Sequence, residues 1–548
     1  MKRRTSWTVQ KRNGVWWLVD PRGRRMVYTS VQCVGPKHGS RVKGAPAYDG
    51  IAASGSLPAW VENTERRLKA WGMKGLGAWN HQLWRWRDVP YTECLNIWKS
   101  LWAKGKLKSV FDPDWEQSVE KHVAPQIRAL REAPSLVGWF LDNEIPWNLG
   151  FLDRYFELPN GDPGRAAALA FLRRRHGTIG RLNRAWGTKL SSFAALARCR
   201  KIPAGPDATR QDRLVFLGFV ARRFFKTTCA IVRGLDPDRL ILGVRYAGFP
   251  LAPVVAAQRG CTDVVSMNFY IQEGEFPAEK AEDAHRLAGG QPVWITEFSW
   301  HAPYDNRSGD RNTIGFGSRV RFQKSRGLAY ERFVKGGARL PFMIGFDWFQ
   351  WCDESPQGRS DGEDVNFGLV DIEDRPYAEL VGRIARTNRV LEKLHAASRG
   401  RRAARAEVRA LPRLDVSRTG AALAPLRFRP GPDPKPARVP AAAWVAWSPE
   451  ALFVAVDVRD AVRTVDLVKT KRSIEWFWMT DVVELLMRAG EAGPEALDAA
   501  AVKAFAVPDG AGRGRPFLGA WRNHKKTFAG AAGFRAVQTG IPGGYRMK

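Results

Sequence analysis

Two glutamates stand at the ends of apolar, strand-like runs of the sequence. The first run is Leu136-Val-Gly-Trp-Phe-Leu-Asp-Asn-Glu144, and the second is Val293-Trp-Ile-Thr-Glu297-Phe-Ser299. Burying an unpaired carboxylate costs on the order of several kcal/mol, or forces the group to take up a proton, so carboxyl groups at such positions need a reason. Two carboxyl groups, one protonating a leaving oxygen and one attacking the anomeric carbon, are what cleavage of a glycosidic bond by double displacement requires.

Eight apolar segments that resemble strands would carry these glutamates. They are Met26–Val34, Gly75–Asn80, Val89–Ile97, Leu136–Glu144, Leu240–Ala247, Val264–Tyr270, Val293–Ser299 and Pro341–Trp351. Amphipathic stretches with apolar residues at helical spacing lie between most of them, such as 114–132, 212–235 and 318–336. Strand and helix repeated eight times predict an α/β protein with a (β/α)8 TIM barrel. A doubly wound open sheet is the alternative, but both glutamates stand at strand C-terminal ends, where barrel enzymes place their chemistry.

The remaining segments predict additions to this barrel. A hairpin of Gly14–Asp20 and Arg24–Tyr28 should cover the barrel floor, and the long insertion 145–202 should contain a helix over Leu169–Trp186. We expect a catalytic domain over 1–397 and an Ala/Arg- and Pro-rich linker over 398–440. Alternating strands then predict a β-sandwich module over 441–548, which we expect to be incomplete because the sequence stops within a strand-like segment.

Composition excludes several classes of function. The net charge of +32 is spread along the chain, with +21 in residues 1–400 and +11 in 401–548, so a nucleic-acid partner is not expected. A uniform positive potential would instead attract an acidic or sulfated polysaccharide. The six Cys and eight His are scattered, so we expect free thiols, no metal site and no cofactor. No apolar run is long enough to span a membrane.

The motifs along the barrel resemble those of the clan A retaining glycoside hydrolases, and most closely the family-fifty agarases and related β-galactosidases. The Asn-Glu pair on strand four with the Glu on strand seven is specific to the clan. The narrower likeness to agarases rests on segments that cover about residues 14–395 in the family's order. They are Trp16–Gly23, Gly75–Trp79, Pro90–Thr92, Gly138–Glu144, Asp263–Tyr270, Ile295–Phe298, Asp347–Asp353 and Asn366–Asp371 leading to Pro376-Tyr377. The tail is similar to family-nine-type carbohydrate-binding modules, in which Trp444, Trp447, Trp476 and Trp478 would stack on sugars or pack in the sandwich.

The resemblance implies roles for individual side chains. Glu144 would be the acid/base and Glu297 the nucleophile, with Asn143 on the sugar 2-hydroxyl, Tyr270 holding Glu297 ionised and Trp348 flooring the sugar subsite. We also expect substrate contacts from Trp79, Asn80, Asn268, Arg245 and Trp351, although core packing or a structural ion pair would explain several of these equally well. One departure concerns strand two: clan members often carry an Arg there beside the nucleophile, whereas this chain has Ala78-Trp-Asn80 and places Arg245 at the end of strand five.

The sequence therefore predicts a retaining β-glycosidase that acts on a galactan-type polysaccharide or oligosaccharide. The alternative is a non-catalytic carbohydrate-binding protein on a degenerate barrel, which the missing strand-two Arg favours. We expect no nucleic-acid or membrane partner, and the sequence does not decide the oligomeric state. The basic N-terminus has no apolar segment after it, so no signal peptide is expected in the chain as given. The location would be cytoplasmic as written, or secreted if translation starts upstream.

Overall fold

The computed structural model describes residues 6–399, apart from 103–107, 272–274, 311 and 313–317, and the backbone of eight strands beyond residue 440. The chain divides into two compact units, Met1–Ala406 and Glu407–Lys548. From residue 400 onward the predicted linker lies outside the described residues, so its limits stay predictions. Within the described part of the chain, no helix combines the length and the apolar composition that crossing a membrane requires.

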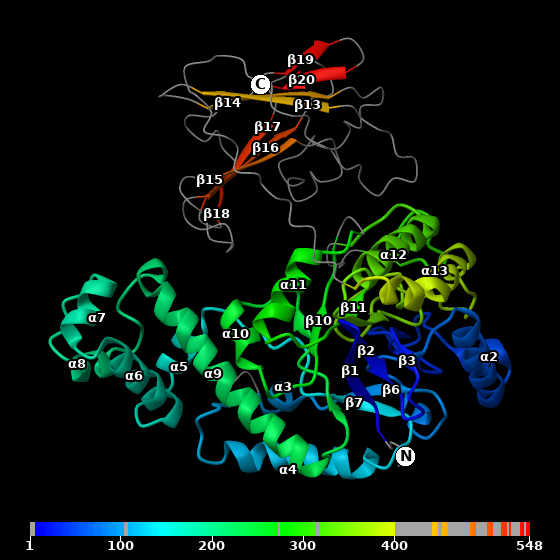
Figure 1. Cartoon of the computed structure of the whole chain (residues 1–548), viewed down its shortest axis with the longest axis horizontal. Helices are drawn as coiled ribbons and strands as arrows, with labels where there is room; N and C mark the ends of the chain where they lie inside the picture. Colours follow the sequence, from blue (N-terminus) through cyan, green and yellow to red (C-terminus); the bar gives the residue numbers. More distant parts are fainter. Residues whose placement is uncertain are drawn as a thin grey trace. The chain divides into compact units, whose positions relative to one another are not determined.

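The first unit is built on a curled parallel sheet of nine strands (Figure 1). The strands are β4 (Tyr28–Val31), β5 (Gly75–Leu76), β6 (Tyr91–Cys94), β7 (Leu136–Phe140), β8 (Leu240–Ile241), β9 (Tyr246–Ala247), β10 (Val265–Asn268), β11 (Val293–Phe298) and β12 (Met343–Trp348). Their order in the sheet is β8-β7-β6-β5-β4-β12-β11-β10-β9. Each of the eight predicted segments contains one of these strands, and Leu240–Ala247 contains both β8 and β9.

The two end strands of this sheet are consecutive pieces of one segment of chain. Only residues 242–245 separate β8 from β9. Backbone bonds from Leu141 N to Gly243 O (2.8 Å) and from Glu144 N to Arg245 O (3.2 Å) continue the pairing with the β7 segment across that gap. The chain itself therefore brings the ends of the curled sheet together, as in a TIM-barrel-like fold.

Helices follow most of the strands and cover the outer face of the sheet. The helices are α1 (Gly50–Ser54), α2 (Leu57–Ala70), α3 (Ile97–Leu101), α4 (Trp115–Leu130), α5 (Phe151–Phe156), α6 (Pro163–His176), α7 (Ile179–Trp186), α8 (Phe193–Arg198), α9 (Pro206–Leu235), α10 (Ala252–Ala257), α11 (Ala278–Leu287), α12 (Gln323–Ala338), α13 (Ala378–Ala396) and the short 3-10 helix η1 (Gln82–Trp84). The three amphipathic stretches correspond to α4, α9 and α12. Helix α12 begins five residues later than predicted, where the Gln323 N–H donates to the Asp305 carboxylate.

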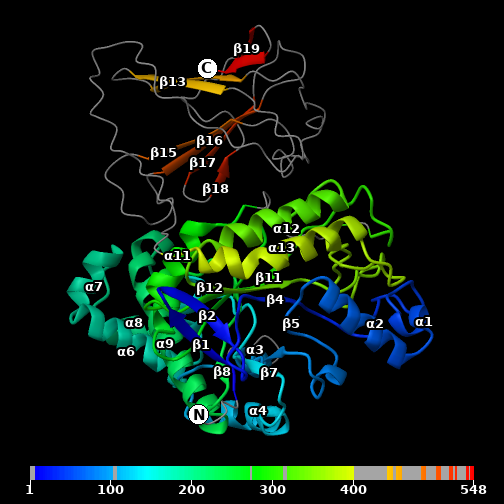
Figure 2. The ribbon, with the colours of Figure 1, turned by 45° about the vertical axis from the view of Figure 1, so that its right-hand side comes forward.

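The insertion after the fourth predicted strand holds α5 to α8, which lie to one side of the sheet in both views (Figures 1 and 2). The single helix predicted over Leu169–Trp186 is wrong, because the structure has two helices there. Helix α6 ends at Gly177, whose φ of 72° favours glycine, and the Thr178 side chain then caps α7 by accepting from Arg181 N. A glycine followed by a capping threonine is a signal for this break.

A small antiparallel sheet covers one end of the barrel-like unit. It consists of β1 (Thr8–Arg12), β2 (Val15–Val19) and β3 (Arg25–Met26). Strands β2 and β3 form the predicted hairpin. Strand β1 is an additional strand that the sequence did not predict, because its residues are mostly polar. Side chains of this sheet pack against the starts of the parallel strands, in a cluster that includes Leu18, Met26, Val137, Leu240, Val264 and Ile344. The N-terminal ends of the strands are therefore covered, as expected, and the opposite ends are left for a site.

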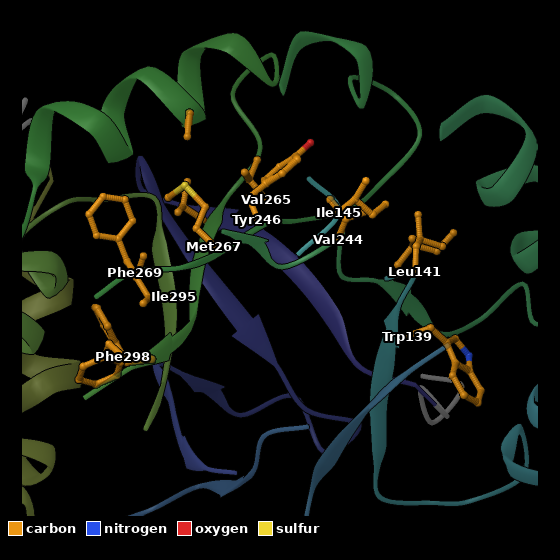
Figure 3. Close-up of a cluster of buried hydrophobic side chains, with 14 of the residues drawn as sticks. Trp139, Leu141, Ile145, Val244, Tyr246, Val265, Met267, Phe269, Ile295 and Phe298 are labelled. Atoms are coloured by element: carbon orange, nitrogen blue, oxygen red, sulfur yellow. The ribbon is translucent and has the colours of Figure 1, made fainter. Parts of the chain in front are cut away.

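Both faces of the parallel sheet are buried, which explains why its strands are apolar without interruption. Strand β7 contributes to two clusters: Val137 and Phe140 belong to the cluster with the small sheet, and Leu136 and Trp139 belong to the larger cluster. Figure 3 shows side chains of the larger cluster along β7, β9, β10 and β11. These contacts fix the strands whose C-terminal ends carry the predicted glutamates.

The second unit contains two four-stranded antiparallel sheets, ordered β13-β14-β20-β19 and β15-β16-β17-β18. The strands are β13 (Ala441–Trp447), β14 (Leu452–Val458), β15 (Val483–Arg488), β16 (Ala501–Val507), β17 (Phe517–Arg522), β18 (Lys525–Thr527), β19 (Gln538–Ile541) and β20 (Gly544–Met547). Strands β14 and β15 coincide with the two alternating apolar runs of this stretch, 451–460 and 481–487. The predicted sandwich packing and the roles of the four tryptophans lie outside the described residues, and stay predictions.

Candidate active site

A cavity of about 850 Å³ opens at the C-terminal ends of the parallel strands. Its lining residues come directly after most of those strands. This C-terminal end of the strands is where TIM-barrel enzymes place their chemistry. The lining consists of Cys33, Trp79, Lys99, Asn143, Glu144, Ala247, Gly248, Phe249, Asn268, Phe269, Tyr270, Ile271, Lys280, Glu297, Phe349, Arg359, Ser360, Asp361, Glu363 and Phe367. Both predicted glutamates and four of the other predicted site residues, Asn143, Tyr270, Asn268 and Trp79, are among them.

Glu297 is the more deeply buried of the two glutamates, with 7% of its surface exposed. One carboxylate oxygen forms an ion pair with the Arg245 guanidinium, and the other accepts a hydrogen bond from the Tyr270 hydroxyl at 2.9 Å. Burial raises the pKa of the Glu297 carboxyl, Arg245 lowers it, and the charge of Glu144 raises it further. The net effect raises the pKa, and Arg245 and Tyr270 stabilise the ionised form against the cost of burial.

Arg245 is fully buried and joins several strands of the sheet. Besides Glu297, its guanidinium donates to Asn143 Oδ1 at 2.8 Å, Gln32 Oε1 at 2.8 Å and the Thr296 carbonyl at 3.2 Å. The Arg245 backbone N–H is itself held by Ser266 Oγ at 2.9 Å. The sequence lacks an Arg in the segment Gly75–Asn80, and the positive charge instead reaches Glu297 from Arg245, between β8 and β9.

Glu144 is half-buried and lies on the same cavity. Its Oε1 accepts a hydrogen bond from Asn268 Nδ2 at 3.0 Å, and the same amide group donates to Asn143 Oδ1 at 3.2 Å. Asn143 Oδ1 therefore accepts from both Arg245 and Asn268, which fixes the orientation of the Asn143 amide. Its Nδ2 group has no partner in the described part of the chain, and stays available to a ligand hydroxyl.

Four residues around the site have backbone conformations that L-residues rarely adopt. The φ angles are 56° at Cys33, 65° at Trp79, 53° at Glu144 and 48° at Arg245. Each follows a parallel strand or interrupts one, and each lines the cavity or contacts a residue that does. Non-glycine residues in this region cost about 1–3 kcal/mol each and gather at functional sites, because surrounding structure must hold them there. Their grouping is independent support for a site at this end of the sheet.

Four predicted substrate contacts do not lie on the cavity, and one of them is the buried Arg245 described above. Asn80 instead holds the loop after β5, since its side chain accepts from Val34 N at 2.9 Å and donates to the Gly77 carbonyl at 2.7 Å. Trp348 and Trp351 are fully buried, and their indole N–H groups donate to the Phe367 carbonyl and the Tyr48 hydroxyl. The expectation that Trp348 floors a sugar subsite is corrected: its ring packs on Phe298, Trp300 and Tyr330.

The aromatic wall on this side of the cavity is Phe349, the neighbour of Trp348, together with Phe367. Successive side chains of an extended segment point to opposite faces, so a prediction that is off by one residue places the wrong ring in the cavity. Sequence reasoning also missed Gln32, Lys99, Lys280 and the loop 359–363. A polar Gln32 within the apolar segment Met26–Val34 is a signal that finds the first of these.

Arg359 is tied to carboxylates in the loop after β12. Its guanidinium lies 3.3 Å from Glu354, 2.9 Å from Asp361 and 2.6 Å from Glu363. No group of three or more His, Cys, Asp or Glu side chains in the described residues is arranged to hold a metal ion.

No protein-family model matches the chain. It is similar to β-agarase B of Vibrio sp. (strain JT0107), at 26% identity over 348 residues that cover 59% of this chain and 35% of that protein. It is also similar to β-agarase A of the same organism, at 29% identity over 365 residues that cover 60% and 35%. The aligned part thus spans about a third of the length of these curated relatives.

Solved structures resemble the chain in fold. An exo-β-agarase superimposes with a TM-score of 0.62 and 23% identity, covering 72% of this chain and 66% of the other. A second agarase gives a TM-score of 0.61 and 22% identity over the same shares. The resemblance to agarases that the sequence motifs predicted is thus confirmed, in sequence by the two Vibrio enzymes and in fold by the two structures.

Proposed function

We propose that the chain is a retaining β-glycosidase that hydrolyses O-glycosidic bonds of a galactan-type polysaccharide or oligosaccharide, in the manner of an agarase or a β-galactosidase. The observation that carries the proposal is that Glu144 and Glu297, from the ends of β7 and β11, line one cavity and are each held by other side chains of the site. The similarity to two β-agarases supports the choice of a galactan as substrate.

In the first step Glu297 attacks the anomeric carbon and forms a covalent glycosyl-enzyme. Arg245 and Tyr270 keep its carboxylate ionised and fix its two oxygens, so that the attacking oxygen is oriented before substrate arrives. Glu144 gives its proton to the departing oxygen, which leaves with the released sugar. Asn268 orients the Glu144 carboxyl from the neighbouring strand β10.

In the second step Glu144 accepts a proton from water, and that water attacks the anomeric carbon of the glycosyl-enzyme. The bond to Glu297 breaks, and the sugar leaves with the configuration it had in the substrate. This scheme requires the two carboxyl groups to lie about 5–5.5 Å apart. Trp79, which is 38% exposed in the cavity, offers an aromatic face for stacking on a sugar ring.

The test is hydrolysis of neutral agar oligosaccharides, with the configuration of the first-formed product followed by proton NMR. We expect the β-anomer to form first and to mutarotate afterwards. First formation of the α-anomer would refute the retaining mechanism. The absence of hydrolysis of any galactan or aryl β-galactoside would refute the proposed activity, and would favour the non-catalytic sugar-binding alternative.

A further inference from the structure

Five charged side chains line the cavity besides the two glutamates. They are Lys99, Lys280, Arg359, Asp361 and Glu363. Their places in the fold separate them into two groups. Arg359, Asp361 and Glu363 belong to the loop after β12, whereas Lys99 follows β6 and Lys280 lies on α11 after β10.

The group after β12 offers no free positive charge. The Arg359 guanidinium is shared among Glu354, Asp361 and Glu363, at distances of 2.6–3.3 Å. With two carboxylates on the cavity and one neutralised cation, this wall repels anions and accepts hydrogen bonds from hydroxyl groups. Such a wall favours an uncharged sugar ring.

The two lysines follow strands that contact Glu144 or its strand. Lys99 follows β6, which pairs with β7, and Lys280 follows β10, whose Asn268 donates to the Glu144 carboxylate at 3.0 Å. Both lysines are exposed, and no carboxylate lies within 4 Å of either ammonium group in the described part of the chain. The backbone N–H of Lys99 donates to Asp142 Oδ2 at 3.2 Å, so helix α3 is anchored to a residue two positions before Glu144. Lys280 Nζ lies 5.9 Å from the centre of the Phe269 ring, which also lines the cavity.

We propose that Lys99 and Lys280 bind an anionic substituent, a sulfate ester or a carboxylate, on the leaving-group part of the substrate. This inference rests on the proposed function, in which Glu144 protonates the departing oxygen and so marks the side on which the leaving sugar lies. The substrate class is then an acidic galactan with a neutral sugar at the bond to be broken. The net charge of +21 over residues 1–400 raises the local concentration of such a polymer.

The test compares three galactan oligosaccharides of equal length: one neutral, one with sulfate esters and one with carboxylates on the leaving-group side. The ratio of kcat/KM for anionic over neutral substrate is measured for the wild type, for the double variant Lys99→Gln/Lys280→Gln, and for a matched control, Lys69→Gln/Lys226→Gln. The control removes the same charge from exposed lysines on α2 and α9 that do not line the cavity.

We expect the wild type to prefer one anionic substrate by roughly fivefold or more at low ionic strength, as two partly exposed ion pairs allow. The preference should disappear in Lys99→Gln/Lys280→Gln and persist in the control. It should also fall in roughly 1 M salt, where the Debye length is about 3 Å. The preferred oligosaccharide tells whether sulfate or carboxylate is the group recognised.

Equal kcat/KM for all three oligosaccharides, or a preference that Lys99→Gln/Lys280→Gln retains, would overturn the inference. If no oligosaccharide is cleaved, the proposed activity is refuted. The anion-binding role of the two lysines is then tested separately, by calorimetric binding of the three oligosaccharides to the wild type and to Lys99→Gln/Lys280→Gln. Tighter binding of an anionic oligosaccharide that is lost in Lys99→Gln/Lys280→Gln supports it, whereas equal binding of all three refutes it.

Discussion

The buried carboxylate of Glu297 takes its properties from residues on two neighbouring strand segments. Arg245 reaches it from the segment between β8 and β9, and Tyr270 reaches it from the end of β10. Both bonds favour the ionised form of Glu297. Glu144 has a different environment, half-exposed and bonded to the neutral amide of Asn268. Two glutamates with different surroundings are suited to different roles in one reaction.

Replacing Glu297 by alanine should abolish turnover, because no other carboxylate of the described residues shares its contacts with Arg245 and Tyr270. Azide or formate should restore part of the turnover of an activated aryl β-galactoside and give a product of inverted configuration. Product analysis by NMR checks this, with circular dichroism to verify folding and the exposed Glu62→Ala on α2 as a control. Undiminished activity in the Glu297 variant would rule out its assignment as nucleophile.

Glu144→Ala should slow hydrolysis of natural oligosaccharides by roughly 10²–10⁴-fold, the usual contribution of a positioned acid. Aryl glycosides with good leaving groups need no proton in the first step, so formation of the glycosyl-enzyme from them should be largely spared. A burst of aryl alcohol followed by slow turnover is the expected kinetic signature. An equal loss of the first step on both classes of substrate would argue against Glu144 as the acid.

Arg245→Gln should move the acid limb of the kcat/KM profile to higher pH. The guanidinium lowers the pKa of Glu297 against the effect of burial, so its removal lets that pKa rise and protonates the nucleophile at a higher pH. Arg245→Lys keeps a positive charge and should leave the acid limb closer to that of the wild type. Profiles with one common acid limb in all three proteins would show that Arg245 is only structural.

At the scale of elements, apolar runs predicted the parallel strands well, because both faces of this sheet are buried and its strands are apolar throughout. Polar residues that end such runs, as Glu144, Asn268 and Glu297 do, were found for the same reason. The face to which a side chain points is harder to predict, since Trp348 and Phe349 differ by one position and only the packing around them decides which ring reaches the cavity. Asn80 was misplaced in the same way, since its neighbour Trp79 lines the cavity, whereas Trp351 is a core residue bonded to Tyr48. Strand β1 was not predicted because a short polar strand lacks apolar periodicity.

The two tryptophans after β5 and on β12 should respond differently to substitution by alanine. Trp348 is fully buried among aromatic rings, so Trp348→Ala should lower the free energy of unfolding by about 3–5 kcal/mol. Trp79 is 38% exposed on the cavity, so Trp79→Ala should mainly raise KM for oligosaccharides and change stability less. Denaturant unfolding and steady-state kinetics on both variants separate the two roles. A larger loss of stability in Trp79→Ala than in Trp348→Ala would contradict this assignment.

At the scale of the whole molecule, the described residues that line the cavity lie between Cys33 and Phe367, within the first compact unit. That unit closes on itself near its C-terminal end, because His395 at the end of α13 contacts the carbonyls of Trp16 and Ala338 at 2.8 and 3.0 Å. These bonds join the last helix to the N-terminal sheet and to α12. The described residues of the site thus all precede position 400.

A chain shortened to end at Arg399 should fold and should cleave soluble oligosaccharides at a rate close to that of the full chain. If the second unit binds sugar, as the likeness to carbohydrate-binding modules predicts, the shortened chain should lose activity on insoluble polymer only, because a tethered module raises the local concentration of substrate. Initial rates on both substrates, with thermal unfolding of both proteins, make the comparison. A shortened chain that fails to fold would show that residues beyond 399 belong to the packing of the barrel, and would refute the predicted domain boundary. Equal losses on soluble and insoluble substrates in a folded chain would instead give the second unit a part in the chemistry of the site.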